Sequence, residues 1–207
     1  MDVQLDSAEV RVLGALMEKE IATPEYYPLS LNALVNAFNQ KSNREPVVSY
    51  DDDTVETALE SLRNKGLSMR ITGRDSRVPK HEQGFTAKFN LGRREAAIMC
   101  VLMLRGPQTP GELRGRTDRL YTFDDLESVE STLHKLVETG FVKQLPRQVG
   151  YKEQRWAHLL SGDVEVEAAP SAASADRGSS DRERIAALER DLAELRREFD
   201  ELKASLG

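Results

Sequence analysis

The stretch DTVETALESLRNKGL (residues 53–67) decides the fold, because a similar stretch, ESVESTLHKLVETGF, recurs at residues 127–141. The two stretches align at a constant offset of 74 residues, which pairs Gly66 with Gly140 and places Val55, Leu59, Leu62 and Leu67 opposite Val129, Leu133, Leu136 and Phe141. An internal repeat of this length indicates two copies of one structural unit.

Each copy is expected to contain three helices. The first copy opens with LDSAEVRVLGAL (5–16), which resembles LGRREAAIMCVL (91–102) in the second, and Asp6 and Glu9 have the spacing of a capping box. Apolar residues at positions i, i+3, i+4 and i+7 predict the next two helices. The two sets are Leu31, Leu34, Val35 and Phe38, and then Val55, Ala58, Leu59 and Leu62.

Signals at the helix ends agree with this pattern. Asp53 is expected to cap the third helix, and Gly66 stands where a left-handed residue commonly ends one. In the second copy, TPGE (109–112) combines a capping threonine, a proline suited to the first helical position and a glutamate that completes a capping box.

Two short strands are expected after each third helix. The predicted strands are LSMRIT (67–72), TAKFNL (86–91), FVKQL (141–145) and QRWAHLL (154–160). Three helices followed by a hairpin are typical of a winged helix, in which the second and third helices form a helix-turn-helix. The predicted fold class is therefore mainly α, of the α+β winged-helix type.

The predicted domain organisation has four parts. Two tandem winged helices span residues 1–90 and 91–162, a flexible linker rich in Ala, Ser and acid spans 163–180, and a coiled-coil helix spans 181–207. FNQKSNREPV, together with the repeat, resembles the YceH-like family of bacterial proteins of unknown function over roughly residues 4–160. That resemblance implies the tandem winged-helix fold and no established activity.

Composition and motifs favour binding over catalysis. The 207 residues include 31% charged residues and carry a net charge of −6. The three histidines (His81, His134, His158) lack paired ligand spacing, and phosphate-loop or nucleophile motifs do not occur. We therefore expect no enzymatic activity, no cofactor and no metal site.

The cellular setting is predicted from apolar content. No apolar run approaches the ~20 residues of a membrane-spanning helix, and acids stand near the N-terminus where a signal peptide would be basic. We expect a cytoplasmic protein that does not enter the membrane. Cys100, inside the apolar run AAIMCVLML, is expected to be a buried, unreactive side chain.

Double-stranded DNA is one candidate partner, because winged helices place the third helix in the major groove and the wing on the backbone. The candidate contacts lie in three segments: the inter-helix loop, the first hairpin and the helix near residue 115. All of them are cations except one amide in the loop. They are Lys41, Asn43, Arg44, Arg70, Arg74, Arg77, Lys80, Arg114 and Arg116. Both third helices begin with acids, which would suit a basic protein partner. We therefore expect a DNA-associated or regulatory protein, and the alternative is a protein-interaction scaffold that uses its winged helices without DNA contact.

NQKSNREP (39–46) has two interpretations that the sequence leaves open. It connects the second and third helices of the first copy, and it is longer than an ordinary helix-turn-helix turn. It is either a structural turn, for which Asn and Ser are suited, or a contact surface in which Lys41 and Arg44 face phosphates.

The C-terminal residues carry a heptad repeat. Apolar residues alternate at spacings of 3 and 4, which is typical of a coiled-coil seam. The seam consists of Ile185, Leu188, Leu192, Leu195, Phe199, Leu202 and Leu206. The flanking charges that would face each other in a parallel pair are opposite in sign, so a parallel homodimer is predicted. The alternative is a lone amphipathic helix that folds back on the body.

Overall fold

Asp6 and Thr109 begin helices as the sequence predicts. In the computed structural model, which describes residues 3–72, 78–147 and 153–163, Asp6 accepts a hydrogen bond from the Glu9 amide at 2.8 Å, and the Glu9 side chain accepts one from the Asp6 amide at 2.8 Å. Thr109 and Glu112 form the same reciprocal box. Both capping-box predictions are confirmed.

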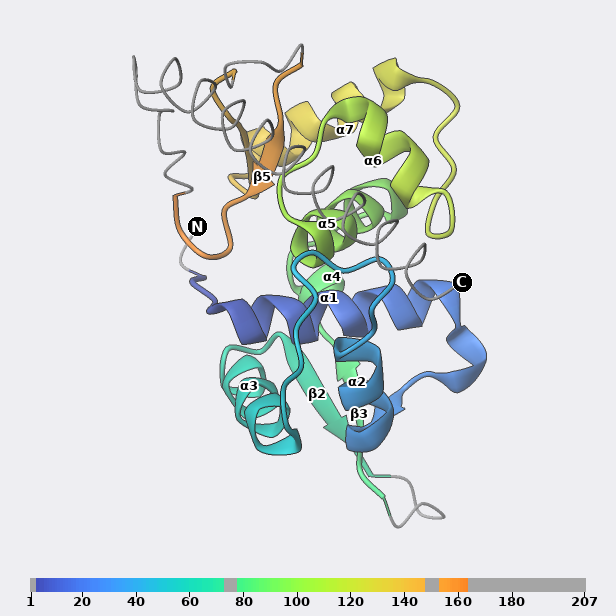
Figure 1. Cartoon of the computed structure of the whole chain (residues 1–207), viewed down its shortest axis with the longest axis vertical. Helices are drawn as coiled ribbons and strands as arrows, with labels where there is room; N and C mark the ends of the chain where they lie inside the picture. The colour runs from blue at the N-terminus through green and yellow to red at the C-terminus, as the bar shows by residue number, and fades with distance from the viewer. Residues whose placement is uncertain (1–2, 73–77, 148–152, 164–207) are drawn as a thin grey trace, which may run out of the picture. The chain divides into compact units, whose positions relative to one another are not determined.

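The first half of the described chain alternates helices with short strands. Its elements are α1 (Ser7–Ala22), a short 3-10 helix (Pro24–Tyr26), β1 (Leu29–Ser30), α2 (Leu31–Phe38), α3 (Asp52–Asn64), β2 (Ser68–Ile71), β3 (Lys80–Gln83) and α4 (Phe85–Lys88). β3 lies between β1 and β2, and both pairings are antiparallel. Figure 1 shows the β2–β3 hairpin extending below α1.

The second half has a similar order of elements. They are α5 (Arg93–Arg105), α6 (Pro110–Thr117), α7 (Leu126–Glu138), β4 (Val142–Gln144) and β5 (Trp156–His158), with β4 and β5 forming an antiparallel pair. The described residues thus contain seven α-helices and two small antiparallel sheets, a mostly helical α+β fold.

The ends of α3 and α7 have the same backbone geometry. Gly66 and Gly140 follow these helices with φ of +66° and +74°, values that glycine adopts without a Cβ penalty. In each case the next residue donates a hydrogen bond back to the helix: the Leu67 amide to the Leu62 carbonyl, and the Phe141 amide to the Leu136 carbonyl. The sequence repeat is therefore a repeat of local structure.

The start of α3 differs from the prediction by two positions. The cap is Asp51, which accepts a hydrogen bond from the Thr54 amide at 2.9 Å, and Asp53 lies inside the first turn. The prediction that Asp53 caps the helix is wrong. Three consecutive aspartates stand at this point, and helical spacing alone does not select among them.

The predicted strand over residues 86–91 is also wrong. The strand that pairs with β2 is β3, and residues 85–88 form a helical turn. Phe85 and Phe89 lie on one face of that turn with ring centroids 5.1 Å apart, and both rings contact Phe141. Burying these rings together requires the spacing of a helix, so packing overrides the strand-like alternation.

Helices α1 and α5 pack on each other and join the two halves (Figure 1). Gly14 allows the close approach, because a Cβ built there would stand 2.9 Å from Leu104 Cδ2. Cys100 is fully buried in this contact and its thiol lies 3.5 Å from the Gly14 carbonyl oxygen. The expectation of a buried cysteine is confirmed.

The predicted linker and coiled coil lie outside the described residues, apart from residue 163. The domain boundary proposed after residue 90 remains a prediction, because the residues on both sides of it belong to one compact unit. Among the described residues, no helix has the length and apolar character needed to cross a membrane.

Candidate functional site: a groove between α3 and the first hairpin

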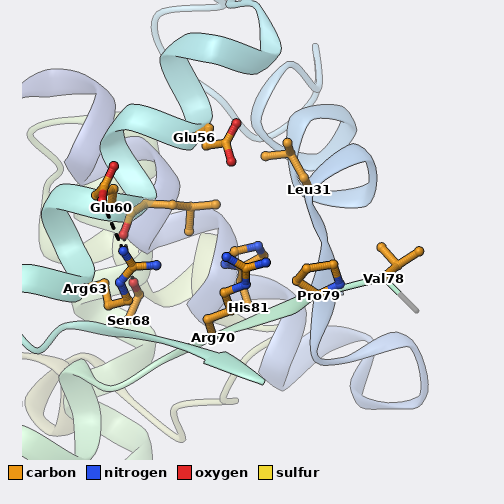
Figure 2. A pocket seen from close by; sticks show the side chains of 10 residues that line it. Leu31, Glu56, Glu60, Arg63, Ser68, Arg70, Val78, Pro79 and His81 are labelled. Atoms are coloured by element: carbon orange, nitrogen blue, oxygen red, sulfur yellow. Dashed lines mark hydrogen bonds and ion pairs between the residues drawn. The ribbon is translucent and has the colours of Figure 1, made fainter. Parts of the chain in front are cut away.

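A groove of about 380 Å³ lies between α3 and the β2–β3 hairpin. Its lining comes from α2, α3 and both strands of the hairpin: Leu31, Glu56, Leu59, Glu60, Arg63, Ser68, Arg70, Val78, Pro79 and His81. Figure 2 shows the α3 side chains along one wall and those of the hairpin along the other.

Strand register determines which hairpin residues face the groove. Arg70 on β2 stands opposite His81 on β3, so the two side chains project from the same face of the sheet. Ser68 shares that face, and its hydroxyl donates to the Leu59 carbonyl of α3 at 3.2 Å. This bond ties the hairpin to the helix at the inner end of the groove.

Helical spacing provides the opposite wall. Glu56, Glu60 and Arg63 are three or four residues apart on α3 and therefore share one face. Glu60 and Arg63 form an exposed ion pair of 3.1 Å. Glu56 is exposed, and no ion pair joins it to another described residue.

The two walls differ in charge. Burial, and next the positive charge of Arg70, lower the pKa of His81, while Glu56 opposes that shift. His81 is therefore neutral at pH 7, and Arg70 is the cation of the hairpin wall. The α3 wall therefore carries the Glu60–Arg63 ion pair and the carboxylate of Glu56, which is unpaired among the described residues, and it faces the Arg70 guanidinium on β2.

Apolar side chains line the groove between these charges. Leu59 is buried beneath it and Leu31 borders it from α2. Val78 is 55% exposed although it is a large apolar residue. Met69 and Ile71 are exposed as well, on the opposite face of the hairpin, where Ile71 pairs with Lys80.

The described residues of the second half have a pocket on α7 that includes Glu130 and His134, but all of its lining residues belong to that one helix, and an aromatic pair occupies the position between helix and hairpin. The offset of 74 relates Glu60 to His134, and the strand registers relate His81 to Trp156. The rings of His134 and Trp156 pack edge to face with centroids 5.8 Å apart, and Trp156 is buried.

Arg44, one of the candidate DNA contacts, is buried inside the fold. Its side chain is 0% exposed, and Nη2 donates to Glu18 at 2.6 Å and to the Ala37 carbonyl at 2.8 Å. A phosphate cannot reach a side chain in this position, so the expectation that Arg44 faces a phosphate is wrong. For this residue, the structural interpretation of NQKSNREP holds.

The same loop joins the two halves of the structure. The Glu45 amide donates to the Leu104 carbonyl at 2.9 Å, and Asn43 accepts a hydrogen bond from Arg105. Glu18 also accepts from Arg119 of the second half at 2.7 Å, so one buried carboxylate binds an arginine from each half. Lys41 remains exposed on the loop.

The other predicted contacts are distributed over several surfaces. Arg70 lines the groove, whereas Lys80 is exposed on the opposite face of the hairpin. On α6, Arg114 donates to the carbonyls of Phe123 and Asp124, and Arg116 binds Gln108 and Glu112.

Among the predicted contacts that the structure describes, two share a site. Asn43 and Arg116 border one small cavity beside Glu18. Arg74 and Arg77 lie outside the described residues.

Sequence reasoning missed the groove's acidic wall as a site. The acids of the third helix suggested a basic partner, but the sequence did not single out Glu56 and Glu60 as groove residues, and the register that sets Arg70 beside His81 has no local signal. Among the described residues, no group of three or more His, Cys, Asp or Glu side chains is arranged to hold a metal ion.

Comparison with known proteins identifies relatives along nearly the whole chain. Residues 5–151 match the model of a family described as "Protein of unknown function, DUF480". A "UPF0502 protein" of Solibacter usitatus is 72% identical over 203 residues, covering 98% of each chain. Another, from Aeromonas hydrophila, is 44% identical over 213 residues, covering 100% of this chain and 98% of the relative. The resemblance to an uncharacterised bacterial family is confirmed.

Proposed function

The chain belongs to this DUF480 family, and we propose that it is a non-enzymatic binding protein whose first-half groove holds a segment of a partner protein. The partner segment carries a basic side chain toward Glu56 and an acidic or carbonyl group toward Arg70. The observation that carries the proposal is the pairing of a carboxylate wall with a cationic wall across an apolar floor.

We infer that each half is a winged helix. The order of three helices and a hairpin supports this in both halves, and in the first half the short β1 adds a third strand beside the hairpin. In this interpretation α3 is the helix that would enter a DNA groove and the β2–β3 hairpin is the wing, so the groove lies between the two elements most often used for recognition.

The charges that line the groove favour a protein ligand over DNA. A nucleic-acid backbone presents negative charge at regular intervals. A phosphate drawn to Arg70 would stand beside the carboxylates of Glu56 and Glu60, and that repulsion offsets the attraction. A polypeptide can present both signs and an apolar side chain within a few residues, which matches all three parts of the lining.

A second candidate function is DNA binding by the outer face of the hairpin. Lys80 is exposed there, away from the α3 carboxylates, and Arg74 and Arg77 lie between β2 and β3 in the sequence, outside the described residues. Binding of this kind would be weak, independent of sequence and sensitive to salt. Anisotropy with a random-sequence duplex across a salt series tests it, and Lys80→Glu should then weaken binding while Lys41→Glu should not.

We further propose a parallel homodimer through residues 181–207. The support is the seam from Ile185 to Leu206 and the sign pattern of its flanking charges. A dimer would present two grooves, so a partner with two copies of the recognised segment would bind with higher avidity than one with a single copy.

The function is tested by peptide selection followed by charge reversal. A displayed library of random peptides is selected on the full chain, and the enriched peptides should combine Lys or Arg with an apolar residue. Glu56→Lys should weaken their binding at least about tenfold, because it turns an attraction into a repulsion of similar size.

Glu130→Lys is the matched control, since Glu130 is the residue at the 74-residue offset on α7 and is equally exposed. Enriched peptides that lack basic residues, or equal effects of the two reversals, would contradict the proposed function.

A further inference from the structure

A second cavity, of about 220 Å³, lies between the two halves, away from the groove. It is bordered by the start of α1, the segment after NQKSNREP, the end of α5 and the end of β5. The lining residues are Ser7, Val10, Arg11, Glu45, Pro46, Val48, Tyr50, Leu102, Met103, Gly106, His158 and Ser161. Most of this lining is apolar, and Arg11 is its one buried cation.

Arg11 is a buried guanidinium without a carboxylate partner among the described residues. It is 5% exposed, and its Nη2 donates to the Pro46 carbonyl. Within residues 3–72, 78–147 and 153–163, no acceptor lies within hydrogen-bonding distance of its Nη1. Burying a charge without a counter-ion is costly, so this side chain would gain from an anion in the cavity.

The neighbours of Arg11 only partly offset the cost of burying its charge. The Phe38 ring lies 6.0 Å from the guanidinium carbon and supplies a weak attraction. Burial, and next the positive charge of Arg44, lower the pKa of Arg11. The buried carboxylate of Glu18 binds Arg44 and Arg119 and forms no ion pair with Arg11.

His158 borders the same cavity with a second nitrogen that lacks a partner. In the part of the chain that the structure describes, its Nδ1 is buried and has no hydrogen-bond partner. Buried polar atoms are usually satisfied, and two unsatisfied nitrogens on residues that line the same cavity indicate a ligand that supplies oxygen atoms.

We propose that this cavity binds a small organic anion in which one carboxylate is attached to an apolar body. The carboxylate binds Arg11, and His158 contributes a further hydrogen bond. The body packs against Val48, Leu102 and Met103. A volume of 220 Å³ corresponds to about seven water molecules and accommodates a ligand of roughly ten non-hydrogen atoms.

The apolar lining distinguishes this ligand from inorganic phosphate. A phosphate ion would exchange its full hydration shell for one guanidinium and several apolar side chains, which is unfavourable. Glu45 is exposed at the edge of the cavity, and its charge acts on Arg105. It therefore repels a highly charged anion more than a monocarboxylate whose apolar end points outward.

The probe for the experiment is 4-fluorophenylacetate. Its binding to the full chain is measured by the fluorine NMR signal of the probe. We expect a dissociation constant below about 1 mM. The neutral amide of the same acid has the same size and should bind at least ten times more weakly, because it lacks the charge that Arg11 recognises. This comparison uses the unaltered protein, so it does not depend on how a variant folds.

Val48→Trp provides the second arm, because the larger ring occupies the cavity and leaves Arg11 in place. It should weaken acid binding at least tenfold, with folding checked by circular dichroism. The proposal is overturned if the acid does not bind at 5 mM, if acid and amide bind alike, or if Val48→Trp binds as the unaltered chain does. Displacement of the acid by an equal concentration of phosphate would also overturn it.

Discussion

Arg44 Nη2 lies 2.6 Å from Glu18 Oε2, and neither side chain is accessible to more than a trace of solvent. The pair joins the NQKSNREP loop to α1, and Arg119 extends it to the second half through the other Glu18 oxygen. The loop has the composition of a nucleic-acid contact, but its Arg44 connects the two halves of the structure.

Replacing Arg44 tests this connection. Arg44→Ala leaves Glu18 buried with only the exposed Arg119 as partner, and breaking a buried pair costs about 3–5 kcal/mol of unfolding free energy. Because Arg119 still partly compensates the charge, we expect a loss of about 3 kcal/mol in urea denaturation. Lys41→Ala, in the same loop but exposed, should change stability by less than about 0.5 kcal/mol. Similar small effects for both variants would contradict the assignment.

Gly14 tests the packing of α1 on α5. Alanine in a helix interior is favoured over glycine by about 1 kcal/mol, yet the added Cβ would stand 2.9 Å from Leu104 Cδ2. Overpacking a core costs about 1–3 kcal/mol, so Gly14→Ala should be neutral to destabilising and Gly14→Val clearly destabilising in thermal unfolding. A Gly14→Ala protein more stable than the parent would show that the helices are further apart than described.

His158 should make stability depend on pH. Burial lowers its pKa to about 4, from the ordinary histidine value of 6.5. The unfolded chain therefore binds a proton more readily than the folded one between these values. Stability from this residue is complete above about pH 6.5 and is lost as the pH falls toward 4.

Substitution of His158 should remove that part of the pH dependence. Between pH 7.5 and pH 5, the unaltered chain should lose about 1–2 kcal/mol more than His158→Gln, measured by denaturation at each pH. Equal losses for the two proteins would mean that the imidazole is solvated in the folded state.

The C-terminal seam predicts the oligomeric state. Light scattering should give the mass of a dimer for the full chain at tens of micromolar, and the mass of a monomer for a chain that ends at Gly162. The leucine and isoleucine seam provides the affinity, and the flanking charge pairs add only about 0.3–0.5 kcal/mol each. A monomeric full chain, or a dimer that survives the deletion, would contradict this prediction.

Local features were predictable from the sequence because their causes lie within a few residues. The capping boxes at Asp6 and Thr109 and the glycine that follows α3 are examples, as each depends on its own helix end. The strand expected over residues 86–91 failed because Phe85 and Phe89 are drawn into a shared aromatic cluster by Phe141, a residue in the second repeat.

The functional features depend on residues far apart in sequence. Arg44 lies 26 positions from Glu18, and neither segment indicates the other. The groove depends on the register that aligns Arg70 with His81, and on α3 packing beside that hairpin. Composition could suggest a binding protein, but only the folded structure shows that the carboxylates of α3 and the guanidinium of Arg70 lie on opposite walls of one groove.

Photocrosslinking from the groove tests the central claim most directly. A photoreactive phenylalanine replaces Val78, which is 55% exposed on the groove's rim, or Leu126, which is 46% exposed on α7 as the matched control. Irradiation in living cells should give a discrete protein adduct from position 78 only. Its crosslinked segment should carry Lys or Arg, and a second substitution, Glu56→Lys, should abolish it. A nucleic-acid adduct at position 78, or adducts equal at the two positions, would contradict the account.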